Sequence, residues 1–185
     1  MLIVIDETDI RKAQQGDREA FIRLFRQLEP EMYGLSKSIL KQDADCADAM
    51  QEATLKAFKS IAGLKQPQYF KTWVLRIVIN ECNQILRNQK RVVMMADVPE
   101  PEPEKLSCSD SGDIGSDIRE KVSRLDDKLR IVTELFYFHD QSVKQIAQVL
   151  DISETAVRTR LHRARSRLMK SYAKSQKGDL NYGSI

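Results

Sequence analysis

The sequence predicts an all-α protein in which two small helical domains are joined by a flexible acidic linker. Apolar residues recur at steps of three and four along most of the 185 residues, as they do on the buried face of an amphipathic helix. An acidic segment in which glutamate alternates with proline, residues 97–104, interrupts that pattern near the middle of the chain. Residues 142–170 have the spacing of two short helices around a tight turn. We therefore expect domains at 1–90 and 117–174, a linker at 91–116 and a tail at 175–185.

The first domain is expected to begin with a short helix over residues 8–15 that ends at Gly16. Asp17 can cap the next helix. Pro30 is expected to interrupt the apolar pattern of that helix, and helical spacing resumes after it. A longer helix opens at Asp43, and its inward face is expected to carry Ala47, Met50, Thr54, Phe58 and Ile61. Glycine, proline and polar residues then predict a loop over residues 63–68.

A helix from Tyr69 to about Arg87 carries an apolar face and a separate stripe of polar residues at steps of four, three and four. The stripe reads cation, amide, amide, cation, a mixture that contacts both phosphates and base edges. The simpler alternative is that these side chains are only solvated. The adjoining loop and its aromatic residues favour nucleic acid, because a base taken out of a stack needs such a pocket. The stripe residues are Arg76, Asn80, Asn83 and Arg87, and Trp73 is expected to belong to the core more than to a stacking surface.

The second domain is expected to end in a helix-turn-helix that two preceding helices support. Ser142 can cap the first helix of this motif, residues 151–153 break the pattern, and Ser153 can cap the second helix. The second helix has apolar residues at steps of four, three and four, which predicts a buried stripe. The stripe residues are Val157, Leu161, Ala164 and Leu168.

The second helix of the motif is also densely cationic. No acidic residue lies between Thr155 and Lys177, a span that holds five arginines and three lysines. Solvated helix faces ordinarily mix both signs, because opposite charges pair one turn apart. A run of one sign repels itself unless an anion lies against it, so the pattern favours nucleic acid over a solvated face. Two short helices with a cationic second member are the layout of a DNA-reading helix-turn-helix.

Several other classes of function are not expected. Three cysteines at wide spacings, without a C-x-x-C pair, argue against a disulfide framework or a zinc site and fit a reducing cytosol. The sequence has no glycine-rich phosphate loop, and nothing brings its two histidines together with a nucleophile. The apolar start MLIVI is too short for a signal or a membrane span. We therefore expect a cytoplasmic protein that is not an enzyme, has no stable membrane insertion and uses no cofactor or metal.

Two separate motifs resemble those of a known family. The stretches DCADAMQEATLKAF and FKTWVLRIVINECNQILR resemble conserved region two of bacterial sigma factors. The stretch RIVTELFYFHDQSVKQIAQVLDISETAVRTRLHRARSRL resembles their region four. The compact size is similar to that of the extracytoplasmic-function (ECF) group, which keeps only these two regions. The resemblance covers nearly the whole chain except the linker and the tail.

The resemblance implies a subunit that binds core RNA polymerase and promoter DNA, recognises −35 and −10 elements, assists DNA melting, and is held by an anti-sigma factor. The D-x-x-Q-E helix would dock on a coiled coil of the largest polymerase subunit through Asp48, Gln51, Glu52 and Lys56. The −10 element would be read by the loop and the helix that follows it, through Lys65, Tyr69, Trp73, Arg76, Asn80, Asn83 and Arg87. The −35 element would be contacted by Ser153, Glu154, Thr155, Arg158, Thr159, Arg160, His162, Arg163 and Arg167.

The sequence departs from the family pattern at three positions. Asp126 stands where the family often has proline, Asp151 where glycine is common in the turn, and Ala156 where threonine is common. Aspartate tolerates the left-handed backbone, so the change at Asp151 is mild, whereas Ala156 lacks a hydroxyl near the groove. Two other classes remain open: a stand-alone helix-turn-helix regulator with a helical sensor domain, and an RNA-binding adaptor indicated by charge alone. A sensor would need an apolar pocket and a dimer face, neither of which is evident in the sequence.

Overall fold

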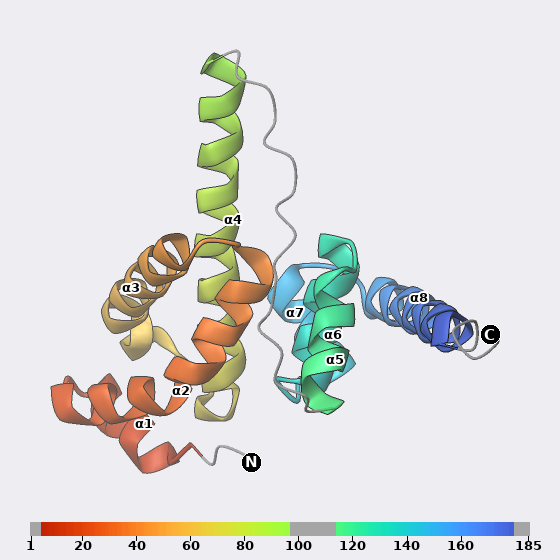
Figure 1. Ribbon diagram of the computed structural model, residues 1–185. Helices are drawn as coiled ribbons and strands as arrows, with labels where there is room; N and C mark the ends of the chain where they lie inside the picture. The colour runs from red at the N-terminus through yellow and green to blue at the C-terminus, as the bar shows by residue number, and fades with distance from the viewer. Residues whose placement is uncertain (1–4, 97–113, 180–185) are drawn as a thin grey trace. The chain divides into compact units, whose positions relative to one another are not determined.

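The computed structural model describes residues 5–96 and 114–179, with side chains for residues 5–91 and 118–173. Throughout these ranges the secondary structure is helical and contains no strand, which confirms the all-α prediction. The chain divides into two compact units, Met1–Glu100 and Pro101–Ile185 (Figure 1). None of the helices in the described ranges combines the length and the apolar character needed to cross a membrane.

The first unit is a bundle in which three longer helices pack against one another, and the short first helix lies against the second (Figure 1). Its elements are α1 (Glu7–Gln14), α2 (Arg18–Ile39), α3 (Asp43–Ser60), η1 (Ile61–Gly63), η2 (Pro67–Tyr69) and α4 (Phe70–Ala96). The Asp17 carboxylate accepts a hydrogen bond from the Ala20 amide at 3.1 Å, so the predicted cap of α2 is confirmed. Gly16 has a φ of +96°, which lets the chain reverse between α1 and α2.

Pro30 does not interrupt the helix that contains it, which corrects the expected interruption. α2 runs through the proline, and the buried stripe of Leu28, Met32 and Leu35 continues in one register across it, each residue at most 1% exposed. A proline inside a helix costs about 3 kcal/mol because it removes a hydrogen bond and crowds the preceding turn. Burying one such side chain contributes about 1.5–3 kcal/mol, so packing of the continuous face outweighs the penalty.

The buried face of α3 also differs from the expected one. Of the five residues expected to face inward only Ile61 is buried, whereas Met50 and Thr54 are half-buried and Ala47 and Phe58 are exposed. The residues that α3 buries are small: Cys46, Ala49, Ala53 and Ala57. Short side chains allow α3 to approach α4 closely, and this leaves the larger apolar residues on the side that faces α2.

Two of the three cysteines lie in the interior of the first unit. Cys46 and Cys82 are fully buried and unpaired, which confirms that they are small core residues. Burial raises the pKa of both thiols, that of Cys82 to about 11. These thiols are therefore protonated and inert at neutral pH. Cys108 lies outside the described residues.

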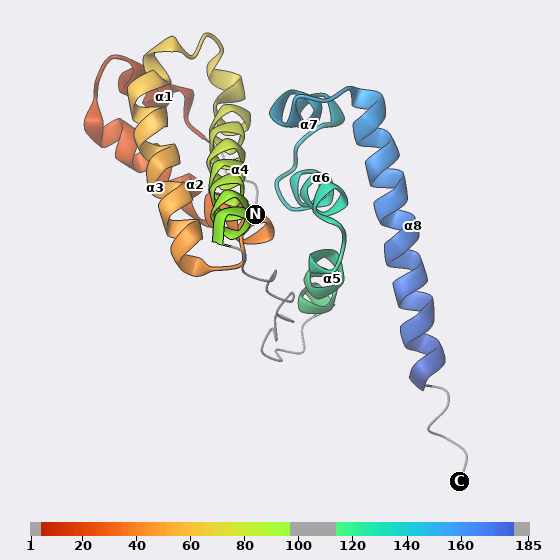
Figure 2. The same ribbon diagram turned by 90° about the horizontal axis from the view of Figure 1, so that it is seen from above.

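The second unit consists of α5 (Ile114–Ser123), α6 (Asp127–Tyr137), α7 (Val143–Leu150) and α8 (Glu154–Asp179). The long helix α8 packs against the other three, as Figure 2 shows from above. One cluster in its core joins α5, α6 and α8 through Val122, Leu125, Leu129 and Ala164, with Phe138 and Leu168 packed against it. Val157, Leu161 and Ala164 are buried and Leu168 is half-buried, so the predicted stripe of α8 is confirmed.

The helix-turn-helix is capped at the predicted positions. The Ser142 hydroxyl accepts from the Gln145 amide at 3.3 Å, and the Gln145 side chain accepts from the Ser142 amide at 2.8 Å, which completes a capping box. Asp151 takes the left-handed conformation with a φ of +53°, and the Ser153 hydroxyl accepts from the Ala156 amide at 3.1 Å. The capping box thus fixes the start of α7. The turn itself is held at the α7 end by the Ile152 amide, which donates to the Ala147 carbonyl at 3.1 Å, and at the α8 end by Ser153.

Helices extend into the segments expected to be linker and tail. α4 continues to Ala96 and α5 begins at Ile114, so residues 91–96 and 114–116 are helical. α8 continues to Asp179, five residues past the expected end of the second domain. Residues 97–113, which include the acidic segment 97–104, and residues 180–185 lie outside the described residues.

Candidate nucleic-acid interface

The polar stripe of α4 lies on the side of the helix that faces away from α2 and α3. Arg76, Asn80 and Arg87 are exposed and Asn83 is half-buried; these four residues are called the α4 stripe below. Arg87 donates a hydrogen bond to the side-chain oxygen of Gln84 at 2.9 Å. Within the part of the chain that the structure describes, neither arginine of the stripe pairs with a carboxylate. The α4 stripe can therefore contact an external anion or a base edge without first breaking an ion pair.

The loop before α4 and the first turn of α4 carry the other residues expected at the −10 site. Lys65 is exposed, and Tyr69 and Trp73 are half-buried. The Trp73 ring lies 6.0 Å from the ring of Phe70, which is 1% exposed and belongs to the core. Trp73 thus packs on the core with one part of its ring and keeps another part accessible at the edge of the loop.

All four residues of the expected polymerase surface on α3 are exposed, but one of them also has a partner inside the protein. Asp48, Gln51 and Glu52 all face solvent. Lys56 donates a hydrogen bond to Glu81 of α4 at 2.6 Å, and the Glu81 side chain keeps only 11% of its surface accessible. The ammonium compensates a nearly buried carboxylate and ties α3 to α4. The sequence did not reveal this partner, because Glu81 lies 25 residues away along the chain.

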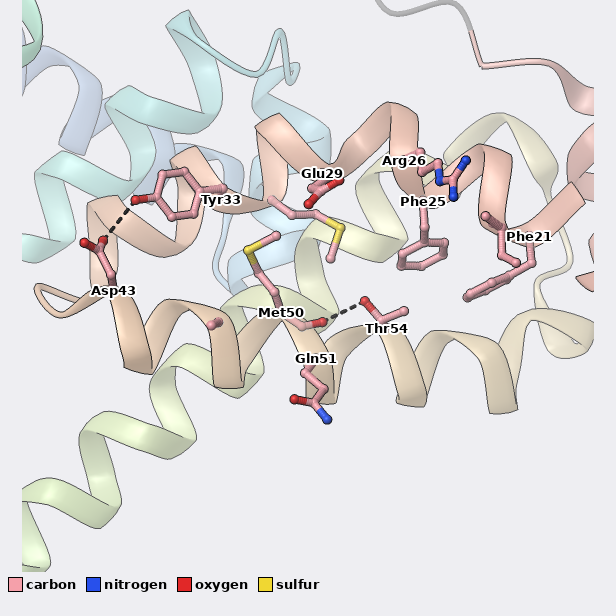
Figure 3. Close-up of a pocket in the computed structure, with 12 residues that line it drawn as sticks. Phe21, Phe25, Arg26, Glu29, Tyr33, Asp43, Met50, Gln51 and Thr54 are labelled. Carbon is pink, nitrogen blue, oxygen red and sulfur yellow. Dashed lines mark hydrogen bonds between the residues drawn. The ribbon is translucent and has the colours of Figure 1, made fainter. Parts of the chain in front are cut away.

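An apolar groove adjoins that surface and was not predicted. It has a volume of about 510 Å³ and lies between α2 and α3, where the side chains of Phe21, Phe25 and Met50 point into it (Figure 3). Phe58 packs edge-on against Phe21, with ring centres 5.0 Å apart, yet remains 45% exposed. The signal that could have found the groove is the run Met50, Thr54, Phe58 at steps of four, which shares α3 with a second stripe of alanines.

The basic face of α8 is defined here as Arg158, Arg160, Arg163, Arg165 and Arg167. Three of these arginines have partners inside the protein. Arg158 lies 3.1 Å from the Glu154 carboxylate, Arg165 donates to the Tyr137 hydroxyl at 2.7 Å, and Arg167 forms an ion pair with Asp126. Arg160 is half-buried and Arg163 is exposed, and within the described residues neither has a hydrogen bond or an ion pair. The five arginines are therefore not equivalent donors.

The two unpaired arginines lie beside a small concave surface. A pocket of about 380 Å³ is lined by Arg160, Arg163 and Arg167 of α8 and by residues 126–129 at the start of α6. Asp126 and Asp127 contribute two carboxylates to the same pocket. An external phosphate that approached these guanidinium groups would therefore compete with Asp126 for Arg167.

The remaining residues expected at the −35 site have mixed roles. His162, Thr155 and Thr159 are exposed, and the Thr159 hydroxyl donates to the Thr155 carbonyl of its own helix at 2.9 Å. Ser153 caps α8, and Glu154 pairs with Arg158. The structure thus brings all nine predicted −35 residues to one helix and its cap, but it uses several of them for local hydrogen bonds.

A capped helix-turn-helix with an exposed cationic second helix defines a DNA-binding unit. Comparison with protein families agrees with this class. The description "Sigma-70, region 4" matches residues 116–168, and "Sigma-70 region 2" matches residues 24–92. Each of the two units therefore contains one matched region.

Curated relatives and solved structures place the chain more narrowly. It is 27% identical over 180 residues to the ECF RNA polymerase sigma factor SigW of Bacillus subtilis (strain 168), an alignment that covers 87% of this chain and 93% of the relative. It is also 27% identical over 173 residues to the ECF RNA polymerase sigma-E factor of Escherichia coli (strain K12), covering 86% and 90%.

One solved structure of similar fold is that of the sigma factor RpoE in complex with the anti-sigma factor NepR from Bartonella quintana. It has a TM-score of 0.69 and 19% identity, and the match covers 81% of this chain and 94% of that chain. CnrH in complex with the cytosolic domain of CnrY has a TM-score of 0.67 and 20% identity, covering 92% and 99%. The chain belongs to the ECF group of the sigma-70 family.

Proposed function

We propose that this protein is a dissociable initiation subunit that directs core RNA polymerase to specific promoters. Its family consists of sigma factors, which are not enzymes in the catalytic sense, and we propose that this chain likewise has no catalysis of its own. The observation that carries the proposal is the pair of exposed polar faces, the α4 stripe and the basic face of α8. They lie on separate units that match regions two and four of one family.

The second unit is proposed to bind the −35 element as duplex DNA, with α8 in the major groove. Arg160 and Arg163 are the arginines whose guanidinium groups are free to form bidentate hydrogen bonds with guanine or to contact phosphate. Arg158, Arg165 and Arg167 must first leave or share an internal partner. Ser153, Glu154, Thr155, Thr159 and His162 complete the proposed contact surface.

The first unit is proposed to bind the −10 element after the strands separate. Amide side chains such as Asn80 and Asn83 pair well with adenine, and Arg76 and Arg87 suit phosphates. Lys65, Tyr69 and Trp73 lie at the adjoining loop, where a partly exposed aromatic ring can stack on an unpaired base. Binding of the melted strand more tightly than the duplex would favour opening of the promoter.

The surface of α3 is proposed to bind the polymerase core. Asp48, Gln51 and Glu52 supply exposed polar contacts, and the neighbouring apolar groove supplies area that a protein partner can bury. Lys56 is proposed to support this surface through Glu81 rather than by direct contact alone. Two solved neighbours are complexes with partner proteins, one of them described as an anti-sigma factor, and this supports our proposal of an anti-sigma partner. We also propose a cytoplasmic location, where core polymerase and promoter DNA are found.

Run-off transcription tests the proposed function. Purified core polymerase and this protein should together start transcripts from a subset of genomic fragments, while core polymerase alone should start none from the same sites. A stand-alone regulator, the second class considered, would give transcripts only when another sigma factor is present. Dependence on another sigma factor would therefore overturn the proposal. Asp48→Arg should weaken binding to core polymerase and leave duplex DNA binding by the second unit unchanged.

A further inference from the structure

The loop that precedes α4 is held from outside by one side chain of α1. Gln14, the last residue of α1, donates from Nε2 to the Leu64 carbonyl at 2.7 Å and to the Ile61 carbonyl at 3.3 Å. Both hydrogen bonds are partly buried, and they connect residues 47 and 50 positions apart. A primary amide carries two N–H donors, so one side chain can satisfy both carbonyls at once.

These two carbonyls are at the start of the loop that the proposed function assigns to the −10 element. Ile61 is 3% exposed and begins η1, and the Leu64 carbonyl is bonded directly to the nitrogen of Lys65. Within the loop the backbone makes short-range bonds, from the Leu64 amide to Ile61 at 3.0 Å and from the Tyr69 amide to Gln66 at 3.1 Å. Gln14 thus fixes the direction in which the chain leaves η1 toward Lys65.

The donor itself is held in place by contacts of α1. Arg23 of α2 binds both carboxylate oxygens of Asp9, at 2.6 and 3.1 Å, and this hydrogen bonding lowers the pKa of Asp9. The same helix is also packed into the bundle through the buried side chains of Ile10 and Ala13. α1 therefore packs against both α2 and the loop, and Gln14 supplies its side-chain hydrogen bonds to the loop.

We propose that Gln14 is a positioning residue that keeps the loop 61–69 in the conformation that receives the melted −10 strand. This inference rests on the proposed function and goes beyond it, because Gln14 belongs to neither the polymerase surface nor the α4 stripe. A loop that is free to adopt many conformations must lose that freedom when it binds, and holding it beforehand removes this penalty from the binding step.

The test compares three variants of the full-length protein in holoenzyme with core polymerase. Gln14→Met keeps the length of the side chain and removes both donors, Gln14→Glu replaces the donors with a carboxylate facing two carbonyls, and Gln15→Met is the matched control. Gln15 is exposed, and within the described residues its side chain makes no hydrogen bond. Binding is measured to a promoter recovered by run-off transcription, once as duplex and once with the −10 segment already unpaired.

The Gln14→Met holoenzyme should bind the unpaired −10 probe about three- to tenfold more weakly, as expected for the loss of one or two net hydrogen bonds. Gln14→Glu should lose more affinity. Its binding should recover relative to Gln14→Met as the pH falls from about 8 to about 5, because partial burial beside two carbonyl oxygens raises the pKa of the new carboxyl and its protonated form regains one donor. Amide hydrogen exchange of residues 61–69 should accelerate in the free variants. Affinity for core polymerase and for an isolated −35 duplex should match that of Gln15→Met.

Unchanged binding to the unpaired probe in both Gln14 variants would overturn the inference, whether or not hydrogen exchange accelerates. Equal losses for the polymerase, the −35 duplex and the unpaired probe would also overturn it, because they would indicate a general loss of folding. If the wild-type protein starts no transcripts with core polymerase, the proposed function fails, and that failure is visible before any variant is made.

Discussion

The α4 stripe and the basic face of α8 are both polar helix faces, but they differ in how many of their arginines pair with other groups of the protein. On α4, the two arginines and two asparagines have no carboxylate partner in the described part of the chain, and Arg87 donates a hydrogen bond to the neutral Gln84. On α8, Arg158 and Arg167 have carboxylate partners and Arg165 is bound to a tyrosine hydroxyl. The α4 stripe, which carries two arginines, has no internal counter-charge within the described residues. The basic face of α8, which carries five, has two of its charges partly neutralised by carboxylates of the same protein.

The difference shows that the number of arginines on a helix does not give the number available to a ligand. Each contact between a cation and a phosphate releases counterions, so the salt dependence of binding counts only those arginines that reach DNA. An internal carboxylate lowers that count without changing the sequence pattern. It also moderates non-specific affinity, which for a dense cationic helix would otherwise be high at every DNA sequence.

The largest effect is expected at the unpaired arginines of α8. If the arginine forms hydrogen bonds with a guanine, Arg160→Ala or Arg163→Ala should weaken −35 duplex binding by about 1–3 kcal/mol. The size of this loss of affinity should then depend on which base stands at one position of the duplex. If the arginine touches only phosphate, the salt slope should fall by about one. Binding is measured by fluorescence anisotropy at several salt concentrations.

Arg165→Ala is the matched control for these two variants, because the Nε of Arg165 is already bound to Tyr137. It should lose less affinity and change the salt slope less than either of them. If Arg165→Ala has an equal or larger effect than both, internal pairing does not decide which arginines reach DNA, and the comparison between paired and unpaired groups is wrong.

A second test separates the amides of the α4 stripe from its cations. Asn80→Ala should weaken binding of holoenzyme to the unpaired −10 strand by about 1 kcal/mol, because a neutral hydrogen bond is lost, and should leave the salt slope unchanged. Arg76→Ala should instead lower the salt slope by about 0.7, the value for one phosphate contact to a single strand. The two variants are compared on one unpaired probe at several salt concentrations. If the salt slope of binding is the same in Asn80→Ala and Arg76→Ala, the stripe's amides and cations do not have the separate roles proposed for them.

A third test extends the comparison to α3, where the structure pairs Lys56 with Glu81. Lys56→Met should lower the free energy of unfolding by about 1 kcal/mol, because the nearly buried carboxylate loses its counter-charge while the ammonium itself was half-exposed. Adding Glu81→Gln should restore most of that stability in urea denaturation. If Lys56→Met leaves stability unchanged and only weakens polymerase binding, Lys56 is a direct contact and the internal pair is unimportant.

The smallest effect is expected from freeing a paired arginine. Asp126→Asn removes the carboxylate partner of Arg167, so duplex DNA binding should tighten by less than about 1 kcal/mol and its salt slope should steepen by up to about one. Asp127→Asn is the control, because Asp127 pairs with Arg130 on its own helix at 2.7 Å. The two variants are compared by salt titration of duplex binding. If the salt slope of duplex binding steepens in Asp127→Asn but not in Asp126→Asn, then Asp126 is not the carboxylate that keeps Arg167 from DNA.

Much of the fold followed from the sequence because the signals are local. The caps at Asp17, Ser142 and Ser153 each join groups three residues apart, and the left-handed turn at Asp151 depends on one residue's backbone. The buried stripe of α8 follows from a period of 3.6 residues in one helix. Exposure of the α4 stripe follows in the same way, since the opposite side of that helix is apolar.

Only the tertiary structure decided which of two possible faces is buried and which charged groups are paired. α3 carries two apolar stripes, and periodicity cannot say that Ala49, Ala53 and Ala57 are buried while Met50 and Thr54 line the groove. Pro30 stays within α2 because the residues before and after it, Leu28 and Met32, are both buried against other helices of the bundle. The partners of Lys56, Arg167 and Gln14 lie 25 to 50 residues away in the sequence. Such contacts depend on how helices pack in space, and a single helical repeat contains no information about them.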